Sequence, residues 1–211
     1  MHENAITSFY EQALKKHGLY SPRALSYNSL ESQITRFKVL SEIVPNLDNQ
    51  SILDVGSGLG DFYHFLNKNF KNIKYTGCDI TPEICQQSKV KYPQIQVYCS
   101  DFLQEFFSEN YDFVFCSGAL NIEMPNHIDY LKKAITKMYA LCNKGVAFNL
   151  PSKLSELAKK NPAIDNEHQD IKIAYVDPCE MFAFCKTLSP RVTLRHDYMP
   201  HDFSIYCYRK Y

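Results

Sequence analysis

The sequence has no excess of charge of either sign, because 23 Lys and Arg residues balance 23 Asp and Glu residues. A chain without a basic field has little long-range attraction for phosphates, so we expect no nucleic-acid partner. It also lacks any apolar run close to the ~20 residues of a membrane span, and its start, MHENAITSFYEQ, lacks the pattern of a signal peptide. These absences predict a cytoplasmic protein with no membrane partner.

Paired cysteine motifs are missing as well. The eight cysteines form no C-x-x-C, and none has zinc-finger spacing with histidines, so we expect no metal site. Most lie inside apolar runs, as Cys116 does in FVFCSG and Cys207 does in SIYCYR. We interpret them as buried free thiols in a reducing compartment.

Strand and helix patterns alternate from residue 51 onward. Strands are predicted at 51–56, 73–80, 94–101, 111–118 and 145–151, and helices at 61–70, 81–92, 127–142 and 177–188. This alternation is typical of βαβ units and of a parallel sheet covered by helices on both faces. Two further strands, 191–198 and 201–209, are joined by a short turn, so the last strand must run antiparallel.

Two segments do not follow this rhythm. Before residue 51, the apolar positions Ile6, Phe9 and Leu14, and then 30–44, follow helical spacing, which predicts a helical cap over 1–50 in front of an α/β domain over 51–211. Together they are expected to form one compact domain. Residues 151–176 are rich in turn-forming residues, and we interpret them as an insertion or lid-like connection.

Glycine is scarce, with seven residues in all, yet Gly56, Gly58 and Gly60 fall within the stretch ILDVGSGLGDF. A glycine-rich turn from strand to helix presents backbone N–H groups at the carboxyl edge of a sheet, where α/β proteins bind ligands. The spacing G-x-G-x-G differs from the dinucleotide fingerprint, because Asp61 takes the place of its third glycine. Asp54 in the strand disfavours a pyrophosphate and suits an amine. An NAD site, or glycines that serve only tight packing, remain the alternatives.

Acidic residues also end the next two strands. Asp79 ends the second strand, where its carboxylate can accept from both hydroxyls of a ribose. Asp101 ends the third strand and could meet an adenine amino group, while Phe102 or Ile80 covers the ring. These positions predict one nucleoside site along the sheet edge.

These motifs, together with YDFVFCSGALN, resemble those of the class I S-adenosylmethionine (SAM)-dependent methyltransferases. The resemblance implies a Rossmann-like seven-stranded sheet in the order 3-2-1-4-5-7-6, with strand 7 antiparallel, and methyl transfer from SAM to leave S-adenosylhomocysteine (SAH). More narrowly, SPRALSYNSLESQITRF and RHDYMPHDFSIYCYR look like an uncharacterised group of bacterial methyltransferase-like proteins, some with trans-aconitate-methyltransferase-like labels.

The resemblance implies a role for each residue along the cofactor. The methionine and ribose part is expected against the turn and the end of the fourth strand, and Asp54 near the amino group. Arg36 pairs with the SAM carboxylate in one interpretation and is an ordinary surface arginine in the other. The predicted cofactor site comprises Asp54, Gly56, Ser57, Gly58, Gly60, Asp79, Ile80, Asp101, Phe102, Ser117, Gly118 and Arg36.

The acceptor is expected above the same sheet edge. His201, Asn121 and Asn149 are the candidate catalytic residues, and His201 is preferred to His196 because strand 7 should border strand 5. Both His-Asp pairs of HDYMPHD are expected on the rim that faces the cofactor. Such a pair can act as a base or as metal ligands, or can simply satisfy a turn. The candidate substrate-binding residues are Arg23, Tyr27 and His196, with Arg23 suited to a small anionic acceptor.

Three functions remain open at this stage. The short neutral chain favours a small-molecule methyltransferase, acting as a monomer or homodimer. A methyltransferase for protein or RNA is the first alternative, although no basic patch is evident. The second alternative is a protein that binds SAM or SAH without methyl transfer.

Overall fold

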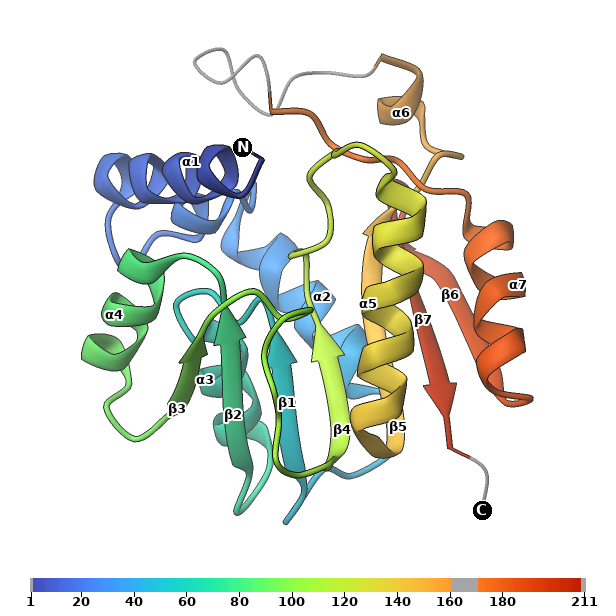
Figure 1. Ribbon diagram of the computed structural model, residues 1–211, viewed down its shortest axis with the longest axis horizontal. Helices are drawn as coiled ribbons and strands as arrows, with labels where there is room; N and C mark the ends of the chain where they lie inside the picture. The colour runs from blue at the N-terminus through green and yellow to red at the C-terminus, as the bar shows by residue number, and fades with distance from the viewer. Residues whose placement is uncertain (1, 161–170, 210–211) are drawn as a thin grey trace.

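The computed structural model describes residues 2–160 and 171–209, which form one seven-stranded sheet flanked by helices (Figure 1). The first half of the chain holds α1 (His2–His17), η1 (Pro22–Leu25), α2 (Leu30–Ser41), β1 (Ser51–Val55), α3 (Asp61–Asn69), β2 (Lys74–Asp79), α4 (Pro82–Lys91) and β3 (Gln96–Cys99). The second half holds β4 (Tyr111–Cys116), α5 (His127–Leu141), β5 (Cys142–Pro151), α6 (Glu156–Lys160), α7 (Pro178–Leu188), β6 (Val192–Met199) and β7 (Asp202–Tyr208).

The strand order is β3-β2-β1-β4-β5-β7-β6, and β7 runs antiparallel to both of its neighbours. This confirms the order that the family resemblance predicts. The parallel strands end along one edge of the sheet, and Pro151 at the end of β5 pairs with Asp202 at the start of β7. The first residues of β7 therefore lie at the same edge as the ends of β1 to β5.

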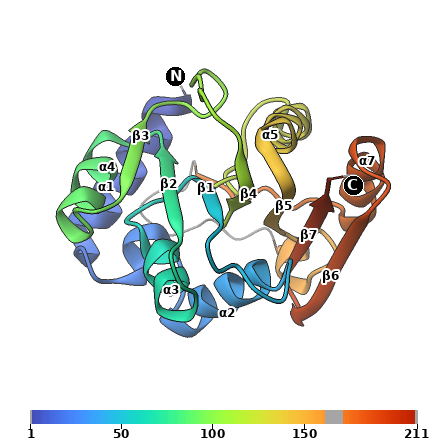
Figure 2. The same cartoon turned by 90° about the horizontal axis from the view of Figure 1, so that it is seen from below.

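Helices cover both faces of the sheet, as the alternating pattern predicts (Figure 2). One core contains α5 and α7, with Leu131 and Met181 fully buried. The other contains α2 and α3, where Phe37 and Phe62 pack together with ring centroids 5.1 Å apart. Burial of such side chains contributes about 2 kcal/mol each, so the sheet is held from both sides.

The predicted helical cap divides into two parts that do different things. Helix α2 packs on one face of the sheet, against β5 and β7. Helix α1 and η1 instead lie over the carboxyl edge, where Leu14 and Ala24 meet Leu59 and Ile84. Helix α1 and η1 are therefore placed to cover a ligand at that edge.

Part of the predicted insertion 151–176 lies outside the described residues, but 171–176 is described and is tied down at both ends. Ile173 forms an antiparallel bridge with Ile122, and Val176 a parallel bridge with Ser152. In the part of the chain that the structure describes, no helix is both long enough and apolar enough to cross a membrane.

The cysteines are unpaired, as the sequence predicts. Six of them are buried, while Cys99 and Cys179 are exposed. The buried thiols behave as small apolar side chains in the two cores.

Candidate functional site

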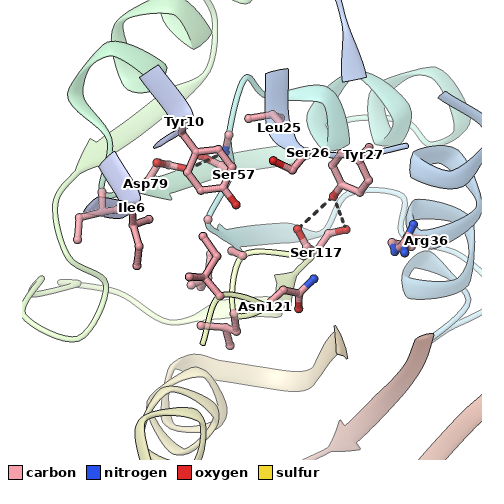
Figure 3. A pocket seen from close by; sticks show the side chains of 18 of the residues that line it. Ile6, Tyr10, Leu25, Ser26, Tyr27, Arg36, Ser57, Asp79, Ser117 and Asn121 are labelled. Carbon is pink, nitrogen blue, oxygen red and sulfur yellow. Dashed lines mark hydrogen bonds between the residues drawn. The ribbon is translucent and has the colours of Figure 1, made fainter. Parts of the chain in front are cut away.

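A cavity of about 650 Å³ lies at the carboxyl edge of the parallel strands, between the strand ends and the N-terminal segment. Asp79 and Ser57 lie at one side of it and Arg36 at the other, with Ser117 and Asn121 between them (Figure 3). Its size lies within the usual range for small-molecule sites.

The turn from β1 to α3 forms the floor of this cavity, and its glycines are needed where other chains come close. Gly56 has φ of +70°, and a Cβ there would lie 1.9 Å from the Cβ of Ala119. Gly58 has φ of +54°, and a Cβ would lie 2.7 Å from a methyl group of Leu25. Both positions combine positive φ with a close approach, so only glycine fits without displacement. Gly60 differs, because it is the N-cap of α3 with φ of +79°, packs beside Tyr92 and does not line the cavity.

Asp54 lies at the bottom of the cavity with 2% of its surface exposed. One carboxylate oxygen, Oδ2, accepts a hydrogen bond from the Tyr75 hydroxyl. The other, Oδ1, is buried and finds no hydrogen-bond partner within the described residues. Burial raises the pKa of Asp54 to about 7, against the opposing hydrogen bond from Tyr75. An oxygen left in this state is well suited to a ligand that brings a positive charge or an N–H group.

Asp79 at the end of β2 is oriented by two backbone N–H groups. Its Oδ2 accepts from Gly58 N at 2.9 Å, and its Oδ1 accepts from Thr81 N at 3.0 Å. Burial raises the pKa of Asp79 above its ordinary value, although these two bonds oppose the shift. The carboxylate is thus fixed in direction, and each oxygen keeps a further lone pair for a ligand.

Asp101 and Phe102, which follow β3, also line the cavity, as does Ile80. Asp101 accepts from Leu103 N at 2.9 Å, which closes a turn and fixes its side chain. Phe102 is 7% exposed and packs into the core. The apolar and acidic groups predicted for an adenine are therefore present together.

Tyr27 joins the N-terminal segment to the end of β4. Its hydroxyl is 3.2 Å from the carbonyl oxygen of Ser117 and 3.1 Å from its Oγ. Gly118 donates its N–H to Asn149 Oδ1 at 3.2 Å. The segment around Tyr27 is thereby held over the cavity.

A buried polar network borders the opposite side. Arg36 Nε donates to Asp202 Oδ2 at 2.6 Å, and Asn149 Nδ2 donates to the same oxygen at 2.9 Å. Arg36 Nη1 donates to the Ser32 carbonyl at 3.1 Å, and Nη2 lies 3.5 Å from His201 Nε2. Burial raises the pKa of Asp202 to about 6, even beside the guanidinium. Burial and Arg36 lower the pKa of His201, so this ring is uncharged at neutral pH.

This network bears on both interpretations of Arg36, as a surface arginine and as the partner of a ligand carboxylate. Its side chain is 12% exposed, so the surface interpretation is wrong. Arg36 lines the cavity, but the carboxylate that it binds in this structure belongs to Asp202 and not to a ligand. No local pattern in the sequence indicates this pair, because the partners lie 166 residues apart.

Four of the predicted site residues do not line the cavity, and each has a physical reason. Gly60 is needed for the helix start. Asn149 is 1% exposed and is occupied by Gly118 and Asp202. Arg23 is exposed on η1. His196 is exposed because the pairing of β6 with β7 shifts between Arg195 and Met199. The prediction that both His-Asp pairs of the hairpin face the cavity is wrong for His196-Asp197.

The remaining predicted residues do line the cavity, including Asn121, Tyr27 and His201. Several lining residues have no sequence signal that could have marked them, since ordinary helix and loop positions bring them there: Ile6, Tyr10, Leu25, His127 and Tyr175.

The charges of the cavity are strongly unequal. Five aspartates line it: Asp54, Asp61, Asp79, Asp101 and Asp202. Lys91 pairs with Asp61 at 2.6 Å from outside the cavity, and Arg36 pairs with Asp202. Among residues 2–160 and 171–209, Arg36 is the only Lys or Arg in the lining. Three carboxylates therefore face the cavity without a paired cation, which favours a cationic ligand over a phosphate.

Comparisons with known proteins agree with this geometry. Residues 52–145 match a family model described as a methyltransferase domain. No curated protein matches the sequence at a significant level.

Three solved structures are similar in fold. A complex described as DhpI–SAH has a TM-score of 0.65 at 14% identity, covering 97% of this chain and 95% of that one. A SAM-dependent methyltransferase from Archaeoglobus fulgidus has a TM-score of 0.65 at 15% identity, with coverage of 87% and 96%. Magnesium protoporphyrin IX methyltransferase from Synechocystis PCC 6803, with bound SAH, has a TM-score of 0.61 at 13% identity, with coverage of 87% and 89%.

Proposed function

We propose that this chain is a class I SAM-dependent methyltransferase that transfers a methyl group from SAM to a small molecule; its sheet topology and the methyltransferase-domain match over residues 52–145 support this. The observation that carries the proposal is the set of three unpaired aspartates, Asp54, Asp79 and Asp101, at the ends of successive strands around one cavity. They match a ligand that has a ribose, an amine and a positive charge. The structures of similar fold with bound SAM or SAH support the same ligand.

The residues present fit SAM on two independent observations. The buried Asp54 Oδ1 has no partner in the described chain, which suits the ammonium group. Gly56 and Gly58 keep the backbone of the turn clear, and Asp79 is aimed by the turn itself. We assign the ribose to Asp79, and the adenine to Asp101 with Phe102 and Ile80. Ser57, Ser117 and Gly118 are assigned to the methionine part.

When bound, SAM would supply a methyl group carried on a sulfonium, and the sulfur would leave as the thioether of SAH when an in-line nucleophile takes the methyl group. The protein must then orient the acceptor and exclude water, since alignment accounts for most of the acceleration. We propose His201 as the base where the acceptor carries a proton, because its ring lines the cavity and is uncharged at neutral pH. Asn121 would bind the acceptor beside it, whereas Asn149 would act only by positioning Asp202.

An acceptor of small size is supported by the way the cavity is covered. The N-terminal segment closes one side through Tyr27, and residues 171–176 border another. The space beyond the proposed cofactor site supports transfer rather than binding alone. Location in the cytoplasm, a bacterial source and a monomeric or dimeric state stay predictions from the sequence.

Calorimetric titration with SAM and SAH tests this proposal. We expect binding of both to the intact chain, and a loss of about 10- to 100-fold in Asp79→Ala, because hydrogen bonds to a charged group are removed. Asp129→Ala, at an exposed position on α5, is the matched control and should bind normally. Failure of the intact chain to bind either compound would overturn the proposal.

A further inference from the structure

The half of the cavity that lies beyond β4 differs in chemistry from the half with the aspartates. Its walls come from the segment after β4, from α5 and α6, and from residues 171–176. The apolar lining residues there are Ile122, Met124, Pro151, Leu157 and Ile173. Two tyrosines, Tyr130 and Tyr175, complete this surface. We call these seven residues the apolar wall.

Ile173 and Tyr175 of the apolar wall belong to residues 171–176, a segment that backbone hydrogen bonds hold in place. Glu123 N donates to Lys172 O, and Ala174 N donates to Asn121 O, both at 2.8 Å. Ile173 and Tyr175 line the cavity, while Ala174 and Val176 are buried. This alternation is that of an extended strand with one side toward the cavity. The wall is therefore built into the fold by backbone hydrogen bonds.

The charged groups in this half cancel one another. Arg36 and Asp202 form an ion pair, with side chains 12% and 1% exposed. The two histidines of the lining, His127 and His201, both have a pKa lowered by burial. In the described chain, no other Lys, Arg, Asp or Glu of the lining lies beyond β4. An acceptor that enters here meets no uncompensated charge.

Three buried polar atoms in this half find no hydrogen-bond partner among the described residues: Asn121 Oδ1 and the two ring nitrogens of His127. Asn121 Oδ1 is buried and accepts no hydrogen bond from the described residues. An amide oxygen in that state suits an O–H or N–H group of a ligand.

We propose that the methyl acceptor is an uncharged molecule with an apolar body, packed on the apolar wall, whose hydroxyl or amine nucleophile lies beside Asn121. This inference rests on the proposed function. As the bond from the nucleophile to the methyl carbon forms, the carbon–sulfur bond breaks and its electron pair stays on sulfur. The proton of the nucleophile passes to the ring of His201, which lines the same cavity.

The same lining residues argue against an anionic acceptor. This includes trans-aconitate, the tricarboxylate suggested by the narrower sequence resemblance. Arg23, the candidate partner for an anion, is exposed and outside the lining. Arg36 could bind an acceptor carboxylate only by giving up Asp202, which would leave that buried carboxylate without its cation. Burying a carboxylate without a partner is strongly unfavourable.

The test compares two probes that share a naphthol body and differ by one carboxylate group: 2-naphthol and 6-hydroxy-2-naphthoate. Each is titrated into the intact chain, with saturating SAH and without it. We expect 2-naphthol to bind at least about tenfold more tightly than the carboxylate, which corresponds to about 1.4 kcal/mol. Trans-aconitate should not bind. Equal or tighter binding of the carboxylate, or no binding of 2-naphthol up to its solubility limit, would overturn the inference.

A variant pair adds a second measurement. Ile173→Lys places a cation on the apolar wall and should shift the preference toward 6-hydroxy-2-naphthoate. Lys172→Gln, at the exposed neighbouring position, should leave the preference unchanged. If the Ile173→Lys preference stays at the value of the intact chain, the assignment of the wall is wrong. If SAM and SAH fail to bind while 2-naphthol binds as expected, the proposed function fails, but the description of this half stands.

Discussion

Asp54 is a carboxyl group whose folded environment favours the protonated form. Burial raises its pKa from 3.8 in the ordinary state to about 7. Between these two values the folded chain holds the proton more tightly than the unfolded chain does. The contribution of this group to stability therefore falls as pH rises from about 4 to about 7, and changes little above that.

A cationic ligand favours the ionised form of Asp54 over the protonated form, and this gives the first prediction. SAM binding requires Asp54 ionised if the ammonium lies against Oδ1, so its affinity should rise about tenfold from pH 6 to pH 8. Calorimetric titration at pH 6, 7 and 8 measures this change. Asp54→Asn should bind more weakly at pH 8 and lose most of the pH dependence. A wild-type affinity that is constant over this range would contradict the role given to Asp54.

At the scale of elements, the ion pair between Arg36 and Asp202 connects α2 to β7. Arg36→Ala would leave a carboxylate that is 1% exposed without its cation, and with only the neutral donors Asn149 and Tyr198 among the described residues. We expect a loss of about 3 kcal/mol in the free energy of unfolding at pH 8. The loss should be smaller at pH 5, because the unpaired carboxyl can then be protonated. Urea denaturation at both pH values measures it.

Arg195 provides the control for that prediction. It also connects the hairpin to α2's end, through Glu42, but its side chain is 27% exposed. Arg195→Ala should therefore cost less than about 1 kcal/mol, as for other exposed ion pairs. If the two variants lose equal stability, burial of the Arg36 pair is not what matters.

Tyr27 connects a second pair of elements, the N-terminal segment and the end of β4. Tyr27→Phe keeps the ring beside Phe37, with centroids 6.2 Å apart, and removes the hydroxyl contacts to Ser117. We expect SAH to bind about fivefold more weakly and to dissociate faster, since one or two hydrogen bonds are worth about 1 kcal/mol. Stopped-flow displacement measures the dissociation rate. Tyr20→Phe, where the side chain is 81% exposed, should match the intact chain; an equal effect would place the cause elsewhere.

These examples show which parts of the site a sequence can predict. The places of Asp54, Asp79 and Asp101 could be predicted because parallel strands end at one edge of the sheet, so position along the chain fixes position in space. The pairing of Arg36 with Asp202 was not predictable, because the two residues lie 166 positions apart in the sequence and no local pattern encodes that contact. His196 was misplaced because strand pairing alone does not reveal the register shift between Arg195 and Met199.

At the scale of the whole molecule, the sheet separates two kinds of chemistry along one edge. The ends of β1, β2 and the segment after β3 present acidic groups, and the region beyond β4 presents the apolar wall. The predicted cap over 1–50 also divides: α1 and η1 cover the acidic half, while α2 is part of a core. That residues 1–50 and 51–211 form one compact domain stays a prediction.

This division predicts where a bound ligand should protect the chain. SAH at 100 times its Kd stabilises the folded state by about 2.7 kcal/mol against global unfolding, and this affects every amide that exchanges globally. Amides that exchange through local opening respond only where the ligand holds the opening segment closed. Hydrogen exchange with and without SAH should thus slow most in 5–28, 56–60 and 117–121. The edge strand β6 and the helix α7 are internal controls, since neither lines the cavity. Local protection that appears in β6 and α7 but not around the turn would mean that SAH binds elsewhere on the molecule.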